Sequence, residues 1–242
     1  MKYAVISDIH GDILAFDVAL SEIEKENVDK IICLGDSVGI GPYANECVKK
    51  IISLGDKIIA VRGNHEDRCI FGCPEFIHDD KKKLSEEELK REAWSRAQLD
   101  EESMNYITNL PQATYIVDGN HKIAITHYPA LEDGSYKKFK FCFSKEECKE
   151  YFKEYNSDIC LYGHTHIPFV SRPDGNWVIN PGSLGLPGYN NYGTYGILNI
   201  SDEKVEYTLH DFKYDYLSVI KSMRDINYPD VENMIRIFFG NR

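Results

Sequence analysis

The side chains that could do chemistry in this sequence are metal-binding types that directly follow short apolar runs. They are Asp8 and His10, Asp36, Asn64 and His65, His127, and His164 and His166. The other three histidines, at positions 78, 121 and 210, do not share this placement. Ligands of α/β proteins bind at the carboxyl ends of the sheet strands, so we expect these eight side chains to meet at one edge.

The number of potential ligands indicates more than one metal ion. Two carboxylates, four imidazoles and one amide oxygen are more than a single divalent ion needs. They suit two ions about 3.5–4 Å apart that share a bridging carboxylate. Glycines at positions 35, 63 and 163 lie beside the candidate ligands, where they let the backbone turn sharply and approach closely. The plainer alternatives are helix capping by the aspartates, an Asx turn at Asn64 and a hydrogen-bonded strand-end histidine at position 127.

The elements that would position these residues alternate between strand and helix in the first half of the chain. Apolar runs predict buried strands at residues 2–7, 30–36 and 57–64. The spacing of apolar side chains predicts a helix at 13–26, and a second helix at 45–55 ends in a glycine. This alternation implies βαβ units and a parallel sheet.

The second half is richer in antiparallel strands. Hairpins are predicted at 113–127, 169–180 and 194–212, with a further strand at 158–163. Helices are expected from Ser85, which forms a capping box with Glu88, from about Asp100, at about 144–155, and over 214–238 with a break at Pro229.

Both halves fit one architecture of two sheets packed face to face with helices outside. We see no boundary that divides the chain, and expect a single domain over 1–242. A helical insertion at about 66–110 and a second insertion at about 129–157 would interrupt it.

Composition limits the classes of binding partner and the cellular compartment that we expect for this protein. The 242 residues carry a formal net charge of −11, which argues against non-specific nucleic-acid binding because phosphate backbones need a basic face. No apolar run approaches the roughly 18 residues of a membrane span, and the N-terminal run is too short for a signal peptide. The seven cysteines are odd in number and irregularly spaced, so we expect reduced thiols and a cytoplasmic location.

Taken in order, the polar clusters resemble the motifs of the calcineurin-like metallophosphoesterases. They are DIH at 8–10, GD at 35–36, GNHE at 63–66, the single His127 and GHTH at 163–166, with a fitting NPGSLG at 180–185. The run GDSVGIGPYANECV at 35–48 looks most like the small bacterial and archaeal phosphodiesterase branch. The resemblance implies a four-layer αββα sandwich of two mixed β-sheets flanked by helices.

The resemblance also implies a role for each residue. Asp8, His10 and His166 would hold one metal ion, Asn64, His127 and His164 would hold the second, and Asp36 would bridge them. Asn64 and His65 would contact the substrate phosphate, and His65 would donate a proton to the leaving group. The implied reaction is hydrolysis of a phosphate ester by a hydroxide that bridges two divalent ions, for which Mn, Fe, Zn, Ni and Co are suited.

The expected partner is a small phosphate ester such as a nucleotide, and the oligomeric state is open. One rival is a protein serine/threonine phosphatase, which VRGNHE resembles. That branch carries Asp-Arg-Gly after the second motif where this chain has Gly39-Ile40-Gly41, so the residue that orients His65 is unidentified. A second rival is a binding module that keeps the fold without catalysis.

Two charged segments have a structural and a functional interpretation. Residues 135–143, SYKKFKFCF, could reach over the site and contact a substrate base or phosphate. We favour an edge strand with its lysines exposed. The charged run at 79–92 is predicted to be a solvated helix face.

Overall fold

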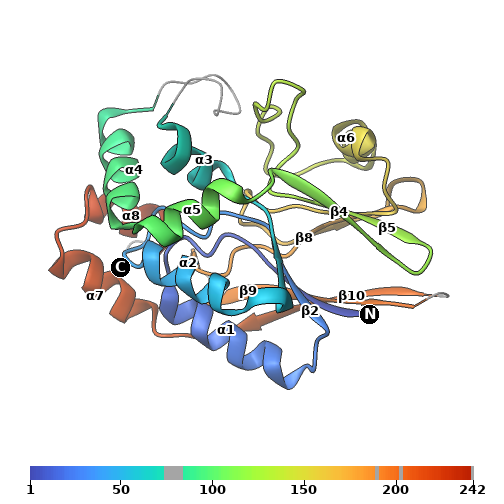
Figure 1. The fold of residues 1–242 in the computed structure, drawn as a ribbon, viewed down its shortest axis with the longest axis horizontal. Helices are drawn as coiled ribbons and strands as arrows, with labels where there is room; N and C mark the ends of the chain where they lie inside the picture. Colours follow the sequence, from blue (N-terminus) through green and yellow to red (C-terminus); the bar gives the residue numbers. More distant parts are fainter. Residues whose placement is uncertain (74–83, 189–190, 202–203, 241–242) are drawn as a thin grey trace.

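The computed structural model describes residues 1–73, 84–188, 191–201 and 204–240, which build two five-stranded sheets (Figure 1). The first sheet has the order β10-β9-β1-β2-β3 and the second has the order β4-β5-β6-β8-β7. The strands of the first sheet are β1 (Lys2–Ile6), β2 (Lys30–Cys33), β3 (Ile58–Ala60), β9 (Gly193–Ile200) and β10 (Val205–Phe212). Those of the second are β4 (Ala113–Asp118), β5 (His121–Thr126), β6 (Ile159–Leu161), β7 (Phe169–Ser171) and β8 (Trp177–Asn180).

Both sheets are mixed, as predicted. Strands β1, β2 and β3 pair in parallel, and β9 joins β1 in antiparallel fashion. In the second sheet β5, β6 and β8 are parallel, while β4 and β7 pair antiparallel to their neighbours. The carboxyl ends of the parallel strands of both sheets therefore lead into the loops that carry the candidate ligands.

The period-2 alternation of β1 and β2 explains why the sheets pack on each other. Tyr3 and Val5 face the second sheet and join a buried cluster with Ile125 and Leu161. Ala4 and Ile6 point to the opposite side and pack against the helices there. Each strand is thus apolar on both faces, as a strand covered on both sides must be.

The helices occupy the outer layers and one end of the sandwich. They are α1 (Ile13–Lys25), α2 (Ala44–Ser53), α3 (Asn64–Phe71), α4 (Glu86–Gln98), α5 (Glu101–Asn109), α6 (Lys145–Phe152), α7 (Tyr216–Asp225) and α8 (Val231–Phe238), with short 3-10 turns at Gly55–Lys57, Lys153–Tyr155 and Pro173–Gly175. Helices α1 and α2 lie outside the first sheet and α6 lies outside the second, which confirms the expected four layers (Figure 1). No helix in the described ranges is long and apolar enough to cross a bilayer.

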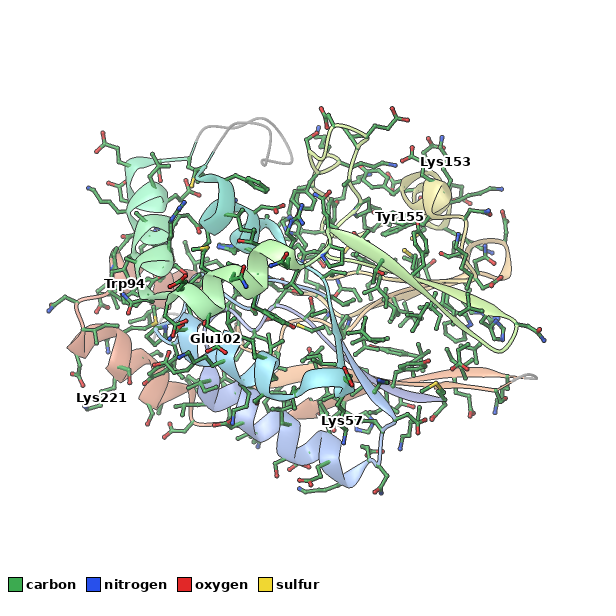
Figure 2. All side chains as sticks on the ribbon, in the orientation of Figure 1. Lys57, Trp94, Glu102, Lys153, Tyr155 and Lys221 are labelled. Atoms are coloured by element: carbon green, nitrogen blue, oxygen red, sulfur yellow. The ribbon has the colours of Figure 1, made fainter. Side chains whose placement is uncertain are left out.

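Helices α3, α4, α7 and α8 gather at the end of the sheets opposite the N-terminus (Figure 1). Trp94 of α4 packs edge-on against Tyr228, with ring centroids 4.8 Å apart, and lies at this end in Figure 2. The capping box at the start of α4 forms as predicted, because Ser85 accepts from the amide of Glu88 and Glu88 accepts from the amide of Ser85. Asp12, rather than Asp8, caps α1 through a hydrogen bond from the amide of Ala15.

The prediction of an edge strand at 135–143 is wrong. Tyr136 makes one isolated bridge with Ala130, and the segment is otherwise irregular. The hydroxyl of Tyr128 accepts from the amide of Lys140 and donates to the carbonyl of Lys138, so side chains satisfy backbone groups that a neighbouring strand would otherwise pair.

A buried carboxylate fastens the loop after β2 to the start of α3. Glu66 is fully buried and accepts from the amides of Asp36 (2.9 Å), Ser37 (2.7 Å) and Gly63 (2.7 Å), and from the Ser37 hydroxyl (2.6 Å). Burial raises the pKa of Glu66, as does Asp36 nearby, while the bonds from Ser37 and Gly63 oppose that shift. This side chain holds Asp36 and the α3 N-terminus in a fixed relation.

Replacing Glu66 with alanine should lower the free energy of unfolding by about 3 kcal/mol, since several buried amides would lose their acceptor. Urea unfolding of Glu66→Ala beside the control Glu24→Ala, at an exposed position of α1, measures this. The control should change stability by less than about 0.5 kcal/mol. Equal unfolding midpoints for the two variants would contradict the role assigned to Glu66.

Candidate metal centre

Three of the predicted ligands form one group at the ends of β1 and β6. Nε2 of His10 lies 3.0 Å from Nε2 of His166, and the latter lies 3.3 Å from Oδ1 of Asp8. Nε2 of His10 is 3.6 Å from the same carboxylate oxygen. Three donor atoms therefore converge on one small volume.

Three others form a second group at the ends of β3, β5 and β6. The amide oxygen of Asn64 lies 3.0 Å from Nε2 of His127 and 2.7 Å from Nδ1 of His164. The two imidazole nitrogens are 3.2 Å apart. The paired histidines after β6 thus serve different groups, with His164 in this one and His166 in the other.

Asp36 lies between the two groups. Its Oδ2 is 3.1 Å from Nε2 of His127 and 3.8 Å from Nε2 of His10. Its Oδ1 accepts a hydrogen bond from the amide of His65, which fixes the carboxylate orientation. One oxygen of Asp36 is therefore placed to face both groups at once.

The chemistry of these donors fits divalent ions. Oxygen and nitrogen atoms whose lone pairs face one another at about 3 Å repel unless they share a proton or a cation, and His, Asp and Asn are the ligands that transition metals accept. Asp8, His10 and His166 could hold one ion, and Asp36, His127 and His164 a second, since the donor atoms of each set lie within 4.8 Å of one another. Nδ1 of His127 is 2.9 Å from the carbonyl of Leu34, an arrangement that places the proton there and leaves Nε2 free as a ligand.

A strained backbone presents many of these side chains. Asp8, His10, Asp36, His164 and His166 have φ between 51° and 68°, in the left-handed region that non-glycine residues rarely occupy. Strain of this kind costs about 1–3 kcal/mol per residue, and it clusters at functional sites where surrounding contacts enforce it. The left-handed conformations therefore lower the stability of the fold, and they direct the candidate ligands toward the two groups.

Close packing and buried hydrogen bonds enforce this geometry. A Cβ at Gly163 would collide with the hydroxyl of Ser7, so only glycine lets the GHTH loop approach the end of β1. Asn180 at the end of β8 donates to the carbonyl of Gly163 (2.7 Å) and the hydroxyl of Thr165 (3.0 Å). The Ser183 hydroxyl donates to the carbonyl of Asp8 (2.8 Å). The NPGSLG segment thus supports both ligand loops, a function that its match to the motif pattern does not reveal.

The electrostatics keep the carboxylates ionised. Burial alone would raise the pKa of Asp8, but His166 and His10 outweigh burial and hold it well below its usual range. In the same way, burial opposes the ionisation of Asp36, and His127 and His65 lower its pKa.

The pKa values of the two most buried imidazoles are shifted in opposite directions. Burial lowers the pKa of His10 to about 4, so this ring is neutral at ordinary pH. Burial would also lower the pKa of His127, but Asp36 outweighs it and raises that pKa to about 9. In the absence of a cation, His127 therefore carries the proton that neutralises part of the carboxylate charge.

His65 is held by a glutamate that sequence analysis did not identify. Nδ1 of His65 lies 3.0 Å from Oε1 of Glu92, and the same oxygen accepts from Arg68 at 2.9 Å. The prediction of a solvated face is therefore wrong for Glu92, which is buried; residues 79–83 of that run lie outside the described residues. Burial opposes ionisation of Glu92, but His65 and Arg68 lower its pKa to about 2.

The Glu92 carboxylate also acts on the imidazole of His65. Burial would lower the pKa of His65, but Glu92 and Asp36 outweigh burial and raise it. The possible ligand atoms of His65, His10 and Asp36 also lie within 4.8 Å of one another, so these three residues could form a third metal-binding group. Because its Nδ1 faces Glu92, only Nε2 is left to act toward the centre.

The centre opens into a shallow hollow of about 220 Å³. Its lining consists of Asp36, Ile40, Asn64, His65, Arg68, Phe139, His164, His166 and Phe238. Asp8, His10 and His127 lie beneath this surface and are buried. The hollow therefore gives a small ligand access to one side of the centre, past His65 and Arg68.

Known proteins resemble this chain over most of its length. The protein MJ0912 of Methanocaldococcus jannaschii is 31% identical over 90% of this chain and 92% of its own. The phosphodiesterase YfcE of Escherichia coli is 24% identical over 82% of this chain and 88% of its own. A crystal structure of a metallophosphoesterase from Sphaerobacter thermophilus superposes with a TM-score of 0.76 at 25% identity and covers all of both chains.

A family profile agrees with these matches and with the resemblance seen in the motifs. The profile of the calcineurin-like phosphoesterase superfamily domain matches residues 1–203, which include every candidate ligand. Relatives named as phosphodiesterases occur in bacteria and in archaea. The chain therefore belongs to the calcineurin-like phosphoesterase superfamily, a family of metal-dependent phosphoester hydrolases.

Proposed function

We propose that this chain is a dinuclear metal-dependent phosphodiesterase or nucleotide phosphohydrolase that acts on a small phosphate ester, with His65 as proton donor. The observation that carries the proposal is the shared position of Asp36 between two groups of ligands, beside a hollow that exposes His65. Mn, Fe, Zn, Ni and Co all suit the mixed nitrogen and oxygen ligands. Single-domain organisation with the two insertions, and a cytoplasmic location, stay predictions.

In this proposal, Asp8, His10 and His166 would hold one ion, Asn64, His127 and His164 would hold the other, and Asp36 would be shared between them. Two divalent cations held there would lower the pKa of a coordinated water and neutralise charge on the phosphate oxygens. The residues of the chain then supply orientation and a proton.

His65 and its partners supply the proton to the leaving oxygen. Glu92 fixes the ring through Nδ1 and favours its protonated form, so Nε2 carries the proton that an alkoxide leaving group needs. Arg68 balances the charge of Glu92 and lines the hollow, where a guanidinium can contact a phosphate oxygen. This position differs from that of the arginine in Asp-Arg-Gly, which a protein phosphatase would carry at 39–41.

The first test is hydrolysis of bis-p-nitrophenyl phosphate by the metal-free protein after addition of Mn²⁺, Ni²⁺, Co²⁺, Fe²⁺ or Zn²⁺. We expect turnover with at least one metal and its loss on chelation, because the chemistry depends on the cations. A phosphopeptide assayed in parallel should react more slowly than the diester. Faster phosphopeptide hydrolysis would favour the protein phosphatase, and metal binding without turnover of any ester would favour a binding module.

His65→Ala should lower kcat by about 10²–10⁴-fold for an ester with a poor leaving group while both metals stay bound.

In Glu92→Gln the carboxylate that raises the pKa of His65 is lost. The acid form of His65 then disappears at lower pH, so the alkaline fall in rate should move to lower pH. Rate profiles against pH and metal content by elemental analysis measure both effects. Glu87→Gln, an exposed position on the same helix, should leave the profile unchanged; an unshifted profile in Glu92→Gln would contradict the role of Glu92.

Metal affinity should increase with pH. Without metal, His127 is protonated below about pH 9, and it must lose this proton to become a ligand. His10 is already neutral above about pH 4 and contributes no proton. The apparent affinity for Mn²⁺ should therefore rise about tenfold per pH unit between about pH 6 and 8, with release of about one proton.

Calorimetric titrations in buffers of different ionisation enthalpy count the released proton. His210→Gln, on β10 away from the centre, should show the same pH dependence as the parent protein. Affinity that is independent of pH, with no proton released, would show that His127 is not a ligand.

A further inference from the structure

The segment 135–143 brings an aromatic ring to the edge of the metal centre. Phe139 lines the hollow beside Asn64 and His164, and its ring lies edge-on to the imidazole of His164 with centroids 5.2 Å apart. No ligand group includes Phe139, and the chemistry described above does not use it. From this position Phe139 could contact the part of a substrate that lies next to the phosphate.

The ring is held in place by hydrogen bonds on both sides. The carbonyl of Lys138 accepts from the hydroxyls of Tyr128 (3.2 Å) and Tyr151 (3.0 Å), and the amide of Lys140 donates to Tyr128 (2.9 Å). Upstream, the buried Tyr136 donates to Asp67 at 3.0 Å. An aromatic surface that is fixed before binding loses little conformational freedom when a ligand stacks on it.

A second ring continues this surface outward. Phe141 packs edge-on against Phe139 with centroids 4.5 Å apart, and 61% of Phe141 is exposed. The two phenylalanines form an apolar step that leads from His164 to solvent. Stacking on these two rings favours flat aromatic groups, whatever their substituents.

His65, the proposed proton donor, lies at a second hollow as well. A second hollow of about 130 Å³ adjoins His65 and is lined by Arg68, Glu92, Phe238 and other residues, but Phe139 is not among them. Because His65 must reach the leaving oxygen, the leaving group points toward this second hollow. The ester group that stays on phosphorus is then directed toward Phe139.

We propose that Phe139, supported by Phe141, is a specificity-determining residue that selects phosphodiesters whose retained ester group is aromatic, such as an aryl group or a nucleobase-bearing group. This inference rests on the proposed phosphodiesterase function. It adds the class of the substrate, which the ligand set alone does not define.

Two substrates with the same leaving group test the proposal. Bis-p-nitrophenyl phosphate and methyl p-nitrophenyl phosphate both release p-nitrophenolate, and they retain a p-nitrophenyl or a methyl group. The diaryl ester also has two equivalent leaving groups and a more reactive phosphorus, so the test is the change in the ratio of the two rates between the parent protein and its variants. The parent protein should prefer the diaryl ester. Phe139→Ala should lower kcat/KM for it about tenfold, mainly through KM, which corresponds to about 1.4 kcal/mol. The methyl ester should change by less than about twofold.

Matched variants separate stacking from folding. Phe139→Leu keeps an apolar side chain of similar size, so it should fold normally and still lose most of the preference. Phe71→Ala removes a ring that is 54% exposed on α3, outside the lining of the hollow, and should keep the parent ratio. An unchanged ratio of the two esters in both Phe139 variants would overturn the proposal.

Failure of the proposed function would look different. If no metal supports turnover of either ester, that function fails, and binding then decides the present inference. Calorimetry with the metal-loaded protein should show tighter binding of phenyl phosphate than of methyl phosphate, and Phe139→Leu should remove the difference. Equal affinities in the parent protein would overturn the inference independently of catalysis.

Discussion

The Asp36 carboxylate, held between two sets of donors, is the constraint on which the rest of this structure depends. Its Oδ2 lies within 3.8 Å of nitrogens from both ligand groups, and its other oxygen is fixed by the amide of His65. A carboxylate in this position needs cationic partners, which protons on His127 or bound metal ions can supply. The left-handed loops, the buried Glu66 and the support from Asn180 all serve to keep this arrangement in place.

A second layer of charge surrounds the first. Glu92 and Arg68 form a pair in which the carboxylate acts on His65 and the guanidinium offsets the carboxylate. The helix that carries Glu92 packs against the C-terminal helices through Trp94 and Tyr228. The position of the proposed proton donor therefore depends on a helix whose packing involves the last third of the chain.

Much of the fold and of the site could be predicted from the sequence because the signals are local. Apolar runs followed by Asp, Asn or His place the ligands at strand ends, and Ser85 with Glu88 marks a helix start. Glu92 could not be found this way, since it lies 27 residues from His65 and resembles its solvated neighbours on the helix. The alternation of lysine and aromatic residues at 135–143 imitates a strand, but the hydroxyls of Tyr128 and Tyr151 hold its backbone in another shape. Such contacts depend on tertiary structure that a local pattern does not contain.

The division of the ligands between the sheets has a mechanical consequence. Asp8, His10, Asp36 and Asn64 follow strands of the first sheet, whereas His127, His164 and His166 follow strands of the second. The seam between the two sheets therefore runs through both ligand groups. If one sheet slid past the other by an ångström, every ladder of strand hydrogen bonds would survive, yet neither group would keep its geometry. The buried apolar cluster between the sheets, which contains Val5 and Leu161, thus fixes the distance between the candidate ligands of the two sheets.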